Sequence, residues 1–276
     1  MHTKRKILAV ITLIFFMAVV VLAYGYFYAR LPAVVEAEIT LRDLPAEFDG
    51  TKIVFISDIH LGPWRSGQWL SKIVSKINGL QPDLVLLGGD YVERGTEYME
   101  SAFDELSKLK SPLGIYGVMG NHDYLRGVQL APVFMNRAGI EFLDNTGFWI
   151  YQQEARIKIS GLGDLYFGEQ LYEQALGEAV SEDTVILVSH QPDYVESLPD
   201  DRVDLMLSGH THGGQITLFG LWAPIVPSKF GDKYISGFYE TPMTKLLVSN
   251  GLGTFKYPLR YFARPQINVV ILRAGG

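Results

Sequence analysis

Histidine is concentrated in a few short motifs of this sequence. The chain has six histidines, and five of them lie in four motifs that each follow a short apolar run. Imidazole is the commonest metal ligand in proteins, and its pKa also suits it to proton transfer. A glycine-rich fifth motif contributes an aspartate, so the clustering predicts metal chemistry rather than packing. The motifs are Ser57-Asp58-Ile59-His60, Gly88-Gly89-Asp90-Tyr91-Val92-Glu93-Arg94-Gly95, Gly120-Asn121-His122-Asp123, Ser189-His190 and Gly209-His210-Thr211-His212.

Two aspartates of these motifs suit metal binding, although each alone has a simpler explanation. Asp58 and His60 are two residues apart where a strand is expected to end, so a turn there can direct both side chains at one point. An Asp-x-His pair is also common by chance. Asp90 follows two glycines, which let backbone segments approach closely, and its carboxylate can reach two ions at once. The alternative for Asp90 is an ordinary turn aspartate.

The remaining motifs add neutral ligands. Asn121 offers an amide oxygen and His122 an imidazole directly after a strand; Asn121 suits a ligand, whereas His122 suits proton transfer or charge stabilisation. His210 and His212 are separated by one residue in a glycine-rich turn, from which they can contact two neighbouring ions. The chain has no cysteine, so any metal must take nitrogen and oxygen ligands.

Short apolar runs, alternating with helical patterns, must position these motifs. Apolar residues repeat at helical spacing over 69–77 and 102–109. The alternation predicts an α/β fold, in which sites lie beyond the carboxyl ends of the strands. The first five strand runs all end at a motif. The predicted strands are 53–56, 84–87, 115–119, 185–188, 205–207, 246–248 and 267–272.

Composition excludes several classes of protein. The chain has 276 residues, of which 48% are hydrophobic, so it can bury a substantial core and disorder is not expected. The formal net charge is −6 and no basic run follows the first six residues, which argues against a nucleic acid partner. The absence of cysteine excludes disulfides. No protein partner can be inferred from the sequence.

An apolar segment near the N-terminus predicts a membrane anchor. Residues 7–29 form an uncharged run of 23 residues after Lys4-Arg5-Lys6, and at about 1.5 Å per residue a helix of this length spans roughly 34 Å. A cleavable signal peptide has a shorter apolar region, and only Ala23-Tyr24-Gly25 resembles a cleavage site, which favours an uncleaved anchor. The preceding basic residues predict a single-pass protein of the inner (plasma) membrane with its globular part outside the cytoplasm.

Taken together and in order, the five motifs resemble those of the calcineurin-like metallophosphoesterases. The family pattern runs Asp-x-His, Gly-Asp-x-x-(Asp/Glu)-Arg-Gly, Gly-Asn-His-(Asp/Glu), His and Gly-His-x-His, and residues from about 51 to 215 match all five parts. The resemblance implies two metal ions, Mn, Fe or Zn, bridged by Asp90. One would be bound by Asp58, His60, Asp90 and His212, and the other by Asp90, Asn121, His190 and His210.

The resemblance also implies an α/β/β/α sandwich, in which two central sheets are flanked by helices, here preceded by one transmembrane helix. The expected organisation is a cytoplasmic tip and anchor over 1–29, a linker and first strand over 30–50, and the phosphoesterase domain over 51–276. Segments 213–216, 233–237 and 249–253, with Pro258, Arg260 and Pro265, resemble a membrane-linked bacterial subgroup. That subgroup includes phosphodiesterases and enzymes similar to UDP-diacylglucosamine pyrophosphatases of lipid A synthesis.

The implied chemistry is hydrolysis by an ion-activated water. Two cations about 3.5–4 Å apart clamp a phosphoryl group, lower the pKa of a bridging water and steady the leaving oxygen. His122 is no ligand in this assignment; it would protonate the leaving group or stabilise its charge, and Asp123 could orient its imidazole. Arg94 and Arg260 could each contact a phosphate, although Arg94 is equally suited to a structural ion pair.

These expectations predict a membrane-anchored phosphoesterase that hydrolyses a phosphodiester or pyrophosphate, for example in a lipid or cell-envelope precursor such as a UDP-diacylglucosamine-like compound. The anchor and an apolar run over 219–227 motivate the lipid, although that run could instead fold back onto the core. A nucleotide-linked lipid precursor is made on the cytoplasmic face, which conflicts with an outward-facing domain. The alternatives are a phosphomonoesterase or protein phosphatase using the same metal site, and a non-catalytic, tethered metal-binding protein.

Overall fold

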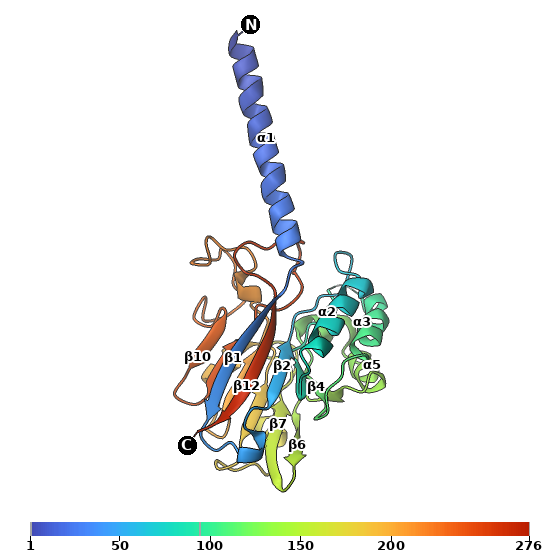
Figure 1. Cartoon of the computed structure of the whole chain (residues 1–276), viewed down its shortest axis with the longest axis vertical. Coiled ribbons are helices and arrows are strands. Elements are labelled where there is room, and N and C mark those ends of the chain that lie inside the picture. The colour runs from blue at the N-terminus through green and yellow to red at the C-terminus, as the bar shows by residue number, and fades with distance from the viewer. Residues whose placement is uncertain (1, 94, 276) are drawn as a thin grey trace.

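A long helix stands on a globular body in the computed structural model, which describes residues 2–93 and 95–275 (Figure 1). This helix, α1 (His2–Tyr28), is the one helix among the described residues that is long and apolar enough to cross a membrane. It is exposed from Thr3 to Tyr24, whereas Gly25 in its last turn and Ala29 just after its end are buried. Only the C-terminal end of α1 therefore contacts the body.

Two six-stranded sheets pack face to face in the body. The first has the order β1-β12-β2-β3-β4-β5, with β2 to β5 parallel, and the second has the order β10-β11-β9-β8-β7-β6, with β7, β8, β9 and β11 parallel. The first sheet contains β1 (Ala33–Leu41), β2 (Lys52–Ile56), β3 (Leu84–Leu87), β4 (Ile115–Gly117), β5 (Glu141–Phe142) and β12 (Gln266–Ala274). The second contains β6 (Thr146–Gln152), β7 (Ala155–Gly161), β8 (Val185–Val188), β9 (Leu205–Ser208), β10 (Gly237–Glu240) and β11 (Lys245–Val248).

Helices cover the outer faces of both sheets. On the outer face of the first sheet lie α2 (Gly67–Gly79), α3 (Met99–Leu106) and α5 (Ala131–Arg137), which share one cluster of buried side chains with β2 and β3 (Figure 1). The second sheet packs against α6 (Tyr172–Leu176). The layers are helix, sheet, sheet and helix, which confirms the expected α/β/β/α sandwich. One further helix, α4 (Asn121–Gly127), starts at a motif.

Side-chain alternation in β2 explains how one strand serves two layers. Val54 and Ile56 pack with the helices, whereas Ile53 and Phe55 pack between the sheets, because successive side chains of a strand point to opposite faces. Both faces are covered, so the parallel strands are apolar throughout; all four residues of β3 are buried. This is why the strands appear in the sequence as short continuous apolar runs.

The seven predicted strands are all present, with ends shifted by at most two residues, as β2, β3, β4, β8, β9, β11 and β12. The two predicted helices are α2 and α3. In α2 the side chain of Ser66 accepts a hydrogen bond from the backbone N–H of Trp69 at 3.3 Å, which caps the first turn. The segment expected as a linker and first strand contains β1, which pairs with β12 along nine residues and so belongs to the first sheet.

Candidate metal centre

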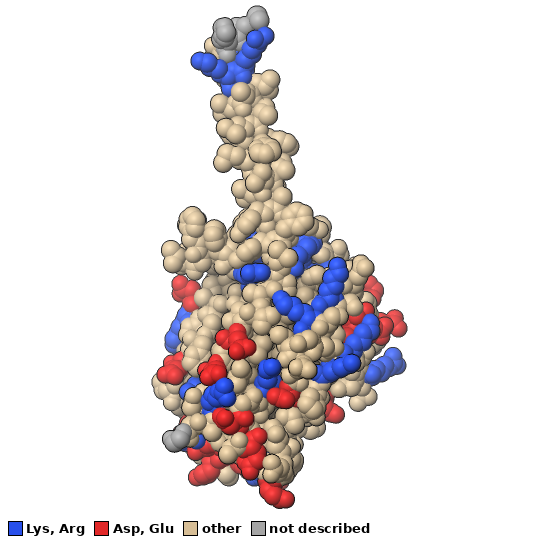
Figure 2. Space-filling model, in the orientation of Figure 1, with Lys and Arg blue, Asp and Glu red and all other residues tan. Residues whose placement is uncertain are grey.

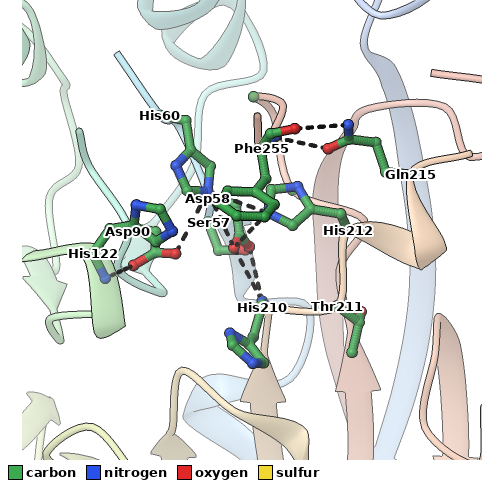
Figure 3. A network of polar contacts seen from close by, with 12 residues as sticks. Ser57, Asp58, His60, Asp90, His122, His210, Thr211, His212, Gln215 and Phe255 are labelled. Atoms are coloured by element: carbon green, nitrogen blue, oxygen red, sulfur yellow. Dashed lines mark hydrogen bonds and ion pairs between the residues drawn. The ribbon is translucent and has the colours of Figure 1, made fainter. Parts of the chain in front are cut away.

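The five motifs meet at one edge of the two sheets. They follow β2, β3, β4, β8 and β9, and the carboxyl ends of these strands lie together because the two sheets pack face to face. Figure 3 shows side chains from both sheets converging there. Sites beyond the carboxyl ends of parallel strands are the rule in α/β proteins.

Backbone strain marks the same residues. A positive φ is unusual for a residue other than glycine, and such strain is concentrated at functional sites. Five of the seven expected ligands have it: Asp58 (50°), His60 (47°), Asp90 (56°), His210 (69°) and His212 (54°). The turns after β2, β3 and β9 therefore hold their side chains in positions that a relaxed backbone would not supply.

Glycines allow the motifs to come this close. A side chain at Gly251, whose φ is 67°, would place its Cβ 2.5 Å from the Cβ of Asp58. A Cβ at Gly209 would collide with Ser57 and Asp58. These positions accept only glycine while Asp58 keeps its place.

Asp58, His60 and His212 form a first buried group. The Nε2 atoms of the two histidines are 3.1 Å apart, and Asp58 Oδ1 lies 3.6 Å from His212 Nε2 and 4.0 Å from His60 Nε2. The hydroxyl of Ser57 donates a hydrogen bond to the Asp58 Oδ2 atom, and the backbone N–H of His210 donates to the same carboxylate at 3.0 Å. The carboxylate is thus held on one side and directed at the imidazoles on the other.

Asp90, His190 and His210 form a second buried group, and Asn121 joins it. His190 Nε2 is 3.2 Å from His210 Nδ1, 3.2 Å from Asn121 Oδ1 and 3.3 Å from Asp90 Oδ2. Four donor atoms therefore converge on one small volume.

Asp90 lies between the two groups. Its Oδ2 is 3.5 Å from His60 Nε2 in the first group and 3.3 Å from His190 Nε2 in the second. Its Oδ1 accepts the backbone N–H of His122 at 2.8 Å, which fixes the carboxylate in this bridging position. One carboxylate thus has access to both groups.

The donor atoms fit two cations. Ligand atoms about 2.0–2.2 Å from an ion lie about 3.0–3.6 Å from each other, and most of the separations fall between 3.1 and 3.6 Å. Burial, the neighbouring His60 and Arg260 hold the pKa of His212 well below its usual range, so this imidazole is neutral, as a ligand must be. Burial and His190 lower the pKa of His210 to about 3.

The carboxylates also create a field that favours positive charge. Burial lowers the pKa of His190, but the Asp90 carboxylate outweighs it and raises that pKa to about 10. The pKa of His60 is raised for the same kind of reason, by Glu93 and Asp90 against burial. The same carboxylates would favour bound cations.

Glu93 supports His60 from behind. Its Oε2 lies 3.0 Å from His60 Nδ1, and its Oε1 accepts the backbone N–H of Lys256 at 3.2 Å. A carboxylate on the far nitrogen of a ligating imidazole fixes the ring and makes it a better ligand. His190 has a similar partner, since its Nδ1 lies 2.6 Å from the carbonyl oxygen of Gly88.

His122 lies beside the two groups, at the margin of the site. Its ring meets that of His60 edge to face, with centroids 4.7 Å apart, and its Nδ1 is 3.2 Å from the carbonyl oxygen of Glu93. Burial lowers its pKa. A carbonyl oxygen can only accept, so Nδ1 carries the hydrogen and Nε2 is the nitrogen that can exchange a proton with a substrate.

Asp123 does not orient His122, contrary to the expectation from the sequence. Asp123 Oδ2 accepts the backbone N–H groups of Asp90 at 2.7 Å and Gly120 at 3.0 Å, and Oδ1 accepts that of Tyr91 at 3.0 Å. As the third residue of α4, it turns back to the start of its own helix and to the loop after β3. Asp123 therefore positions Asp90.

Arg260 is also placed differently from the expectation that it contacts a phosphate. It is completely buried, and its guanidinium donates to the carbonyl oxygens of Gly253, His212, Ala263 and Asn250 at 2.7–3.0 Å. Its Nη2 lies 3.2 Å from His212 Nδ1. Arg260 ties the loops behind the site together and is not open to a substrate. Arg94, the other expected phosphate contact, lies outside the described residues.

Phe255 and Gln215 border the site and were not expected there. The Phe255 ring meets that of His122 with centroids 5.4 Å apart, and Gln215 accepts the backbone N–H of Phe255 at 2.7 Å and donates to its carbonyl oxygen at 2.9 Å (Figure 3). No motif type marks these residues. Their sequence signals are indirect: Gln215 lies in the segment 213–216, and Phe255 follows the glycine-rich segment 249–253.

Comparison with known proteins finds one family over most of the chain. The family model described as calcineurin-like phosphoesterase matches residues 51–214. The chain is 35% identical to the uncharacterized metallophosphoesterase YkuE of Bacillus subtilis, covering 91% of this chain and 90% of that protein. It is 31% identical to the phosphodiesterase YaeI of Escherichia coli, covering 80% and 82%. A transmembrane protein with a metallophosphoesterase domain from Danio rerio is 33% identical, covering 89% of this chain and 58% of that protein.

Solved structures share the fold at low sequence identity. The NAD nucleotidase of Haemophilus influenzae superimposes with a TM-score of 0.50 at 16% identity, covering 73% of this chain and 50% of that one. At this identity the likeness speaks for the fold alone.

Proposed function

This chain belongs to the calcineurin-like phosphoesterases, and from that membership we propose that it is a hydrolase with two metal ions acting on a phosphodiester or pyrophosphate. The observation that carries the proposal is Asp90 Oδ2, which lies within 3.5 Å of a histidine nitrogen in each of the two buried groups. In this proposal Asp90 would be shared by the two ions. Asp58, His60 and His212 would also hold the first ion, and Asn121, His190 and His210 the second.

The residues of the chain have separate roles in the proposed reaction. Bound at these ligands, two cations of Mn, Fe or Zn would supply an activated water and the positive charge that stabilises the phosphoryl group. His122 exchanges a proton with the leaving oxygen through Nε2, because its Nδ1 faces the Glu93 carbonyl oxygen. Glu93 orients His60, and Asp123 holds the loop that carries Asp90.

The preference for diesters rests on relatives and on the anchor. A relative that is 31% identical over 80% of this chain has the name phosphodiesterase. A substrate held in the membrane, such as an envelope precursor with a phosphodiester or pyrophosphate, would suit an enzyme held there. A UDP-diacylglucosamine-like pyrophosphate, made on the cytoplasmic face, would require the domain to face the cytoplasm instead. A phosphomonoesterase would use the same ligands, so the two classes must be separated by assay.

We infer that α1 is an uncleaved anchor, with residues 1–29 as tip and anchor, 30–50 joining it to the sheet, and 51–276 as the phosphoesterase domain. The end of α1 is built into the folded body: Gly25 and Ala29 are buried, and the Gly25 carbonyl oxygen accepts the backbone N–H of Arg260 at 3.1 Å. Arg65 Nη2 donates to the carbonyl oxygen of Ala29 at 2.6 Å. Cleavage after Gly25 would remove part of this contact. The basic N-terminal tip favours an extracytoplasmic domain.

The direct test compares a diester with a monoester. Full-length protein in detergent with Mn²⁺ should hydrolyse bis-p-nitrophenyl phosphate faster than p-nitrophenyl phosphate. An Asn121→Ala variant, which removes one expected ligand, should lose this activity, whereas Asn136→Ala on α5 should retain it. Turnover of the monoester alone would instead assign a phosphomonoesterase, and no turnover of either ester would contradict the proposal.

A further inference from the structure

Apolar side chains gather on loops beside the base of α1. Leu221 is 86% exposed, Ile225 76% and Phe219 69%. The Phe219 ring packs on that of Phe262 with centroids 5.0 Å apart, which joins two loops into one patch. Figure 2 shows an uncharged lobe at this place, next to the helix. We call this patch the anchor-side surface; it consists of Leu218, Phe219, Leu221, Trp222, Ile225 and Phe262.

The run 219–227 therefore does not fold back onto the core, which was one of the two expectations from the sequence. Soluble monomeric proteins seldom expose a contiguous apolar patch of this kind unless it contacts a partner. The patch includes Phe and Trp, aromatic side chains with a large apolar area, and Trp in particular is enriched where water meets a bilayer.

The anchor-side surface is continuous with α1. Tyr261, the neighbour of Phe262, donates its hydroxyl to the carbonyl oxygen of Val21 at 2.7 Å, and its ring lies beside that of Tyr24. A side chain at Gly25 would collide with the Tyr261 ring, so the close approach depends on glycine. Backbone bridges from Ile216 to Tyr261 and Phe262 join the loop that carries Phe219 to the loop that contacts α1.

Helix geometry gives the depth of this contact. A hydrocarbon core of about 30 Å takes about 20 residues of helix at 1.5 Å per residue, so a core that starts at Ile7 ends near Tyr26. Val21 lies five residues before that end, or about 7 Å inside the core. Tyr261 reaches Val21, so the loops beside it lie at the boundary of the bilayer and not in bulk water.

The charges around the helix base agree with this placement. Arg30, Lys76 and Arg264 all lie there, and each donates to a backbone carbonyl oxygen of the segment 26–32. In Figure 2 the surface near the base is uncharged or basic, and the acidic residues of this face begin farther from the helix. Basic residues at this level suit anionic lipid headgroups.

The same segment reaches the metal centre. Phe255 borders His122 at one end of the segment 255–262, and Tyr261 contacts α1 at the other. Arg260 contacts both the anchor and the metal centre. Its backbone N–H donates to the carbonyl oxygen of Gly25, and its guanidinium lies 3.2 Å from His212 Nδ1. A single residue therefore links the anchor to the metal centre.

We propose that the anchor-side surface lies in the interface of the bilayer that α1 spans, and that the metal centre takes amphiphilic phosphodiesters or pyrophosphates from that leaflet. The substrate class rests on the proposed hydrolase function, whereas the membrane contact of the loops does not. The loops place the site at the level of the lipid headgroups, where the phosphates of such amphiphiles lie.

Insertion of the loops can be measured by fluorescence, because the chain has no cysteine and one can be introduced for labelling. Full-length Leu221→Cys carries the environment-sensitive dye NBD in vesicles of phosphatidylethanolamine and phosphatidylglycerol. Tyr151→Cys is the matched control: it is also exposed and lies in β6, at the end of the body away from α1 (Figure 1). Emission from the label at position 221 should be shifted to the blue and quenched by a lipid that carries a nitroxide near its headgroup. Emission from the label at position 151 should show neither effect. Equal, unquenched emission from both would overturn the proposal.

The substrate class is tested with two chromogenic diesters that differ only in their tail. Hexadecyl p-nitrophenyl phosphate in the vesicles should be hydrolysed about tenfold faster than methyl p-nitrophenyl phosphate, because the anchor-side surface holds the metal centre at the level of the lipid phosphates. Leu221→Glu should remove this preference and leave the methyl diester unaffected, and Tyr151→Glu should change neither rate. Hydrolysis of the methyl diester without a preference would overturn the substrate class and leave the hydrolase function standing. Label insertion without hydrolysis of either diester would reject the hydrolase function and support the membrane contact.

Discussion

Glu93→Gln should weaken metal binding although Glu93 is not an expected ligand. The Glu93 carboxylate lies 3.0 Å from His60 Nδ1 and both side chains are buried. A hydrogen bond to a charged group contributes about 1.5–3 kcal/mol, and the neutral amide of glutamine retains part of it. A loss of about 1.4 kcal/mol corresponds to tenfold, so we expect about a tenfold lower affinity for the first ion in Glu93→Gln and up to about a hundredfold in Glu93→Ala.

The assay is calorimetric titration of ion-free, full-length protein with Mn²⁺. Glu100→Gln is the control, because this substitution removes the same charge from an exposed residue in the same stretch of chain. Rates with bis-p-nitrophenyl phosphate at saturating Mn²⁺ should recover in Glu93→Gln, since excess ion compensates for weaker binding. An unchanged Mn²⁺ affinity in Glu93→Ala would show that the carboxylate does not prepare His60 as a ligand.

Three further predictions concern stability and positioning. Burial raises the pKa of Asp144 to about 7, so the folded protein binds this proton more tightly than the unfolded chain does. The resulting stabilisation is complete below about pH 4 and is lost as the pH rises through 7, which lowers the free energy of unfolding by at most about 4 kcal/mol. Urea unfolding of ion-free protein at pH 5 and pH 8 should therefore show a flatter pH dependence in Asp144→Asn than in the native chain. Asp123→Ala leaves the N–H groups of Asp90, Tyr91 and Gly120 without their buried acceptor, at about 1–3 kcal/mol each, and should lower both the unfolding midpoint and the diester rate; Asp123→Asn should recover part of both. Chelation should lower the melting temperature, and Mn²⁺ should restore it, since ions that bind only the folded state stabilise it; a melting temperature independent of chelator would contradict the two-ion site.

The strands were predictable from the sequence because the parallel strands are buried on both faces. A strand such as β3, with all four residues buried, appears as an uninterrupted apolar run that ends at a motif. The hairpin of β6 and β7 was not predicted. Residues 148–151 of β6 are an apolar run, but this run does not end at a motif, and most residues of β6 are only partly buried. Short β5 and edge strand β10 carry even less signal.

Residues of the site were predictable where their type alone suggests metal binding, as for His190 and His210. Roles that depend on direction were not. Asp123 stands next to His122 in the sequence, yet its position as the third residue of α4 turns it toward backbone N–H groups. Its capping role could have been inferred from the helix start, had the start at Asn121 been predicted. Arg260 gave no such signal, because its partners are carbonyl oxygens of loops distant in the sequence.

The two-ion mechanism is tested most directly by measuring the number of bound ions and the hydrolysis rate on the same samples. Full-length protein freed of metal should regain hydrolysis of bis-p-nitrophenyl phosphate as Mn²⁺ is added, with full activity only when two ions are bound per chain. Asp90→Ala, which removes the carboxylate between the two groups, should bind fewer ions and stay inactive, whereas Asp104→Ala on the exposed side of α3 should behave as the native chain. Full activity with one ion per chain, or in the presence of chelator, would contradict a reaction that depends on two bridged metal ions.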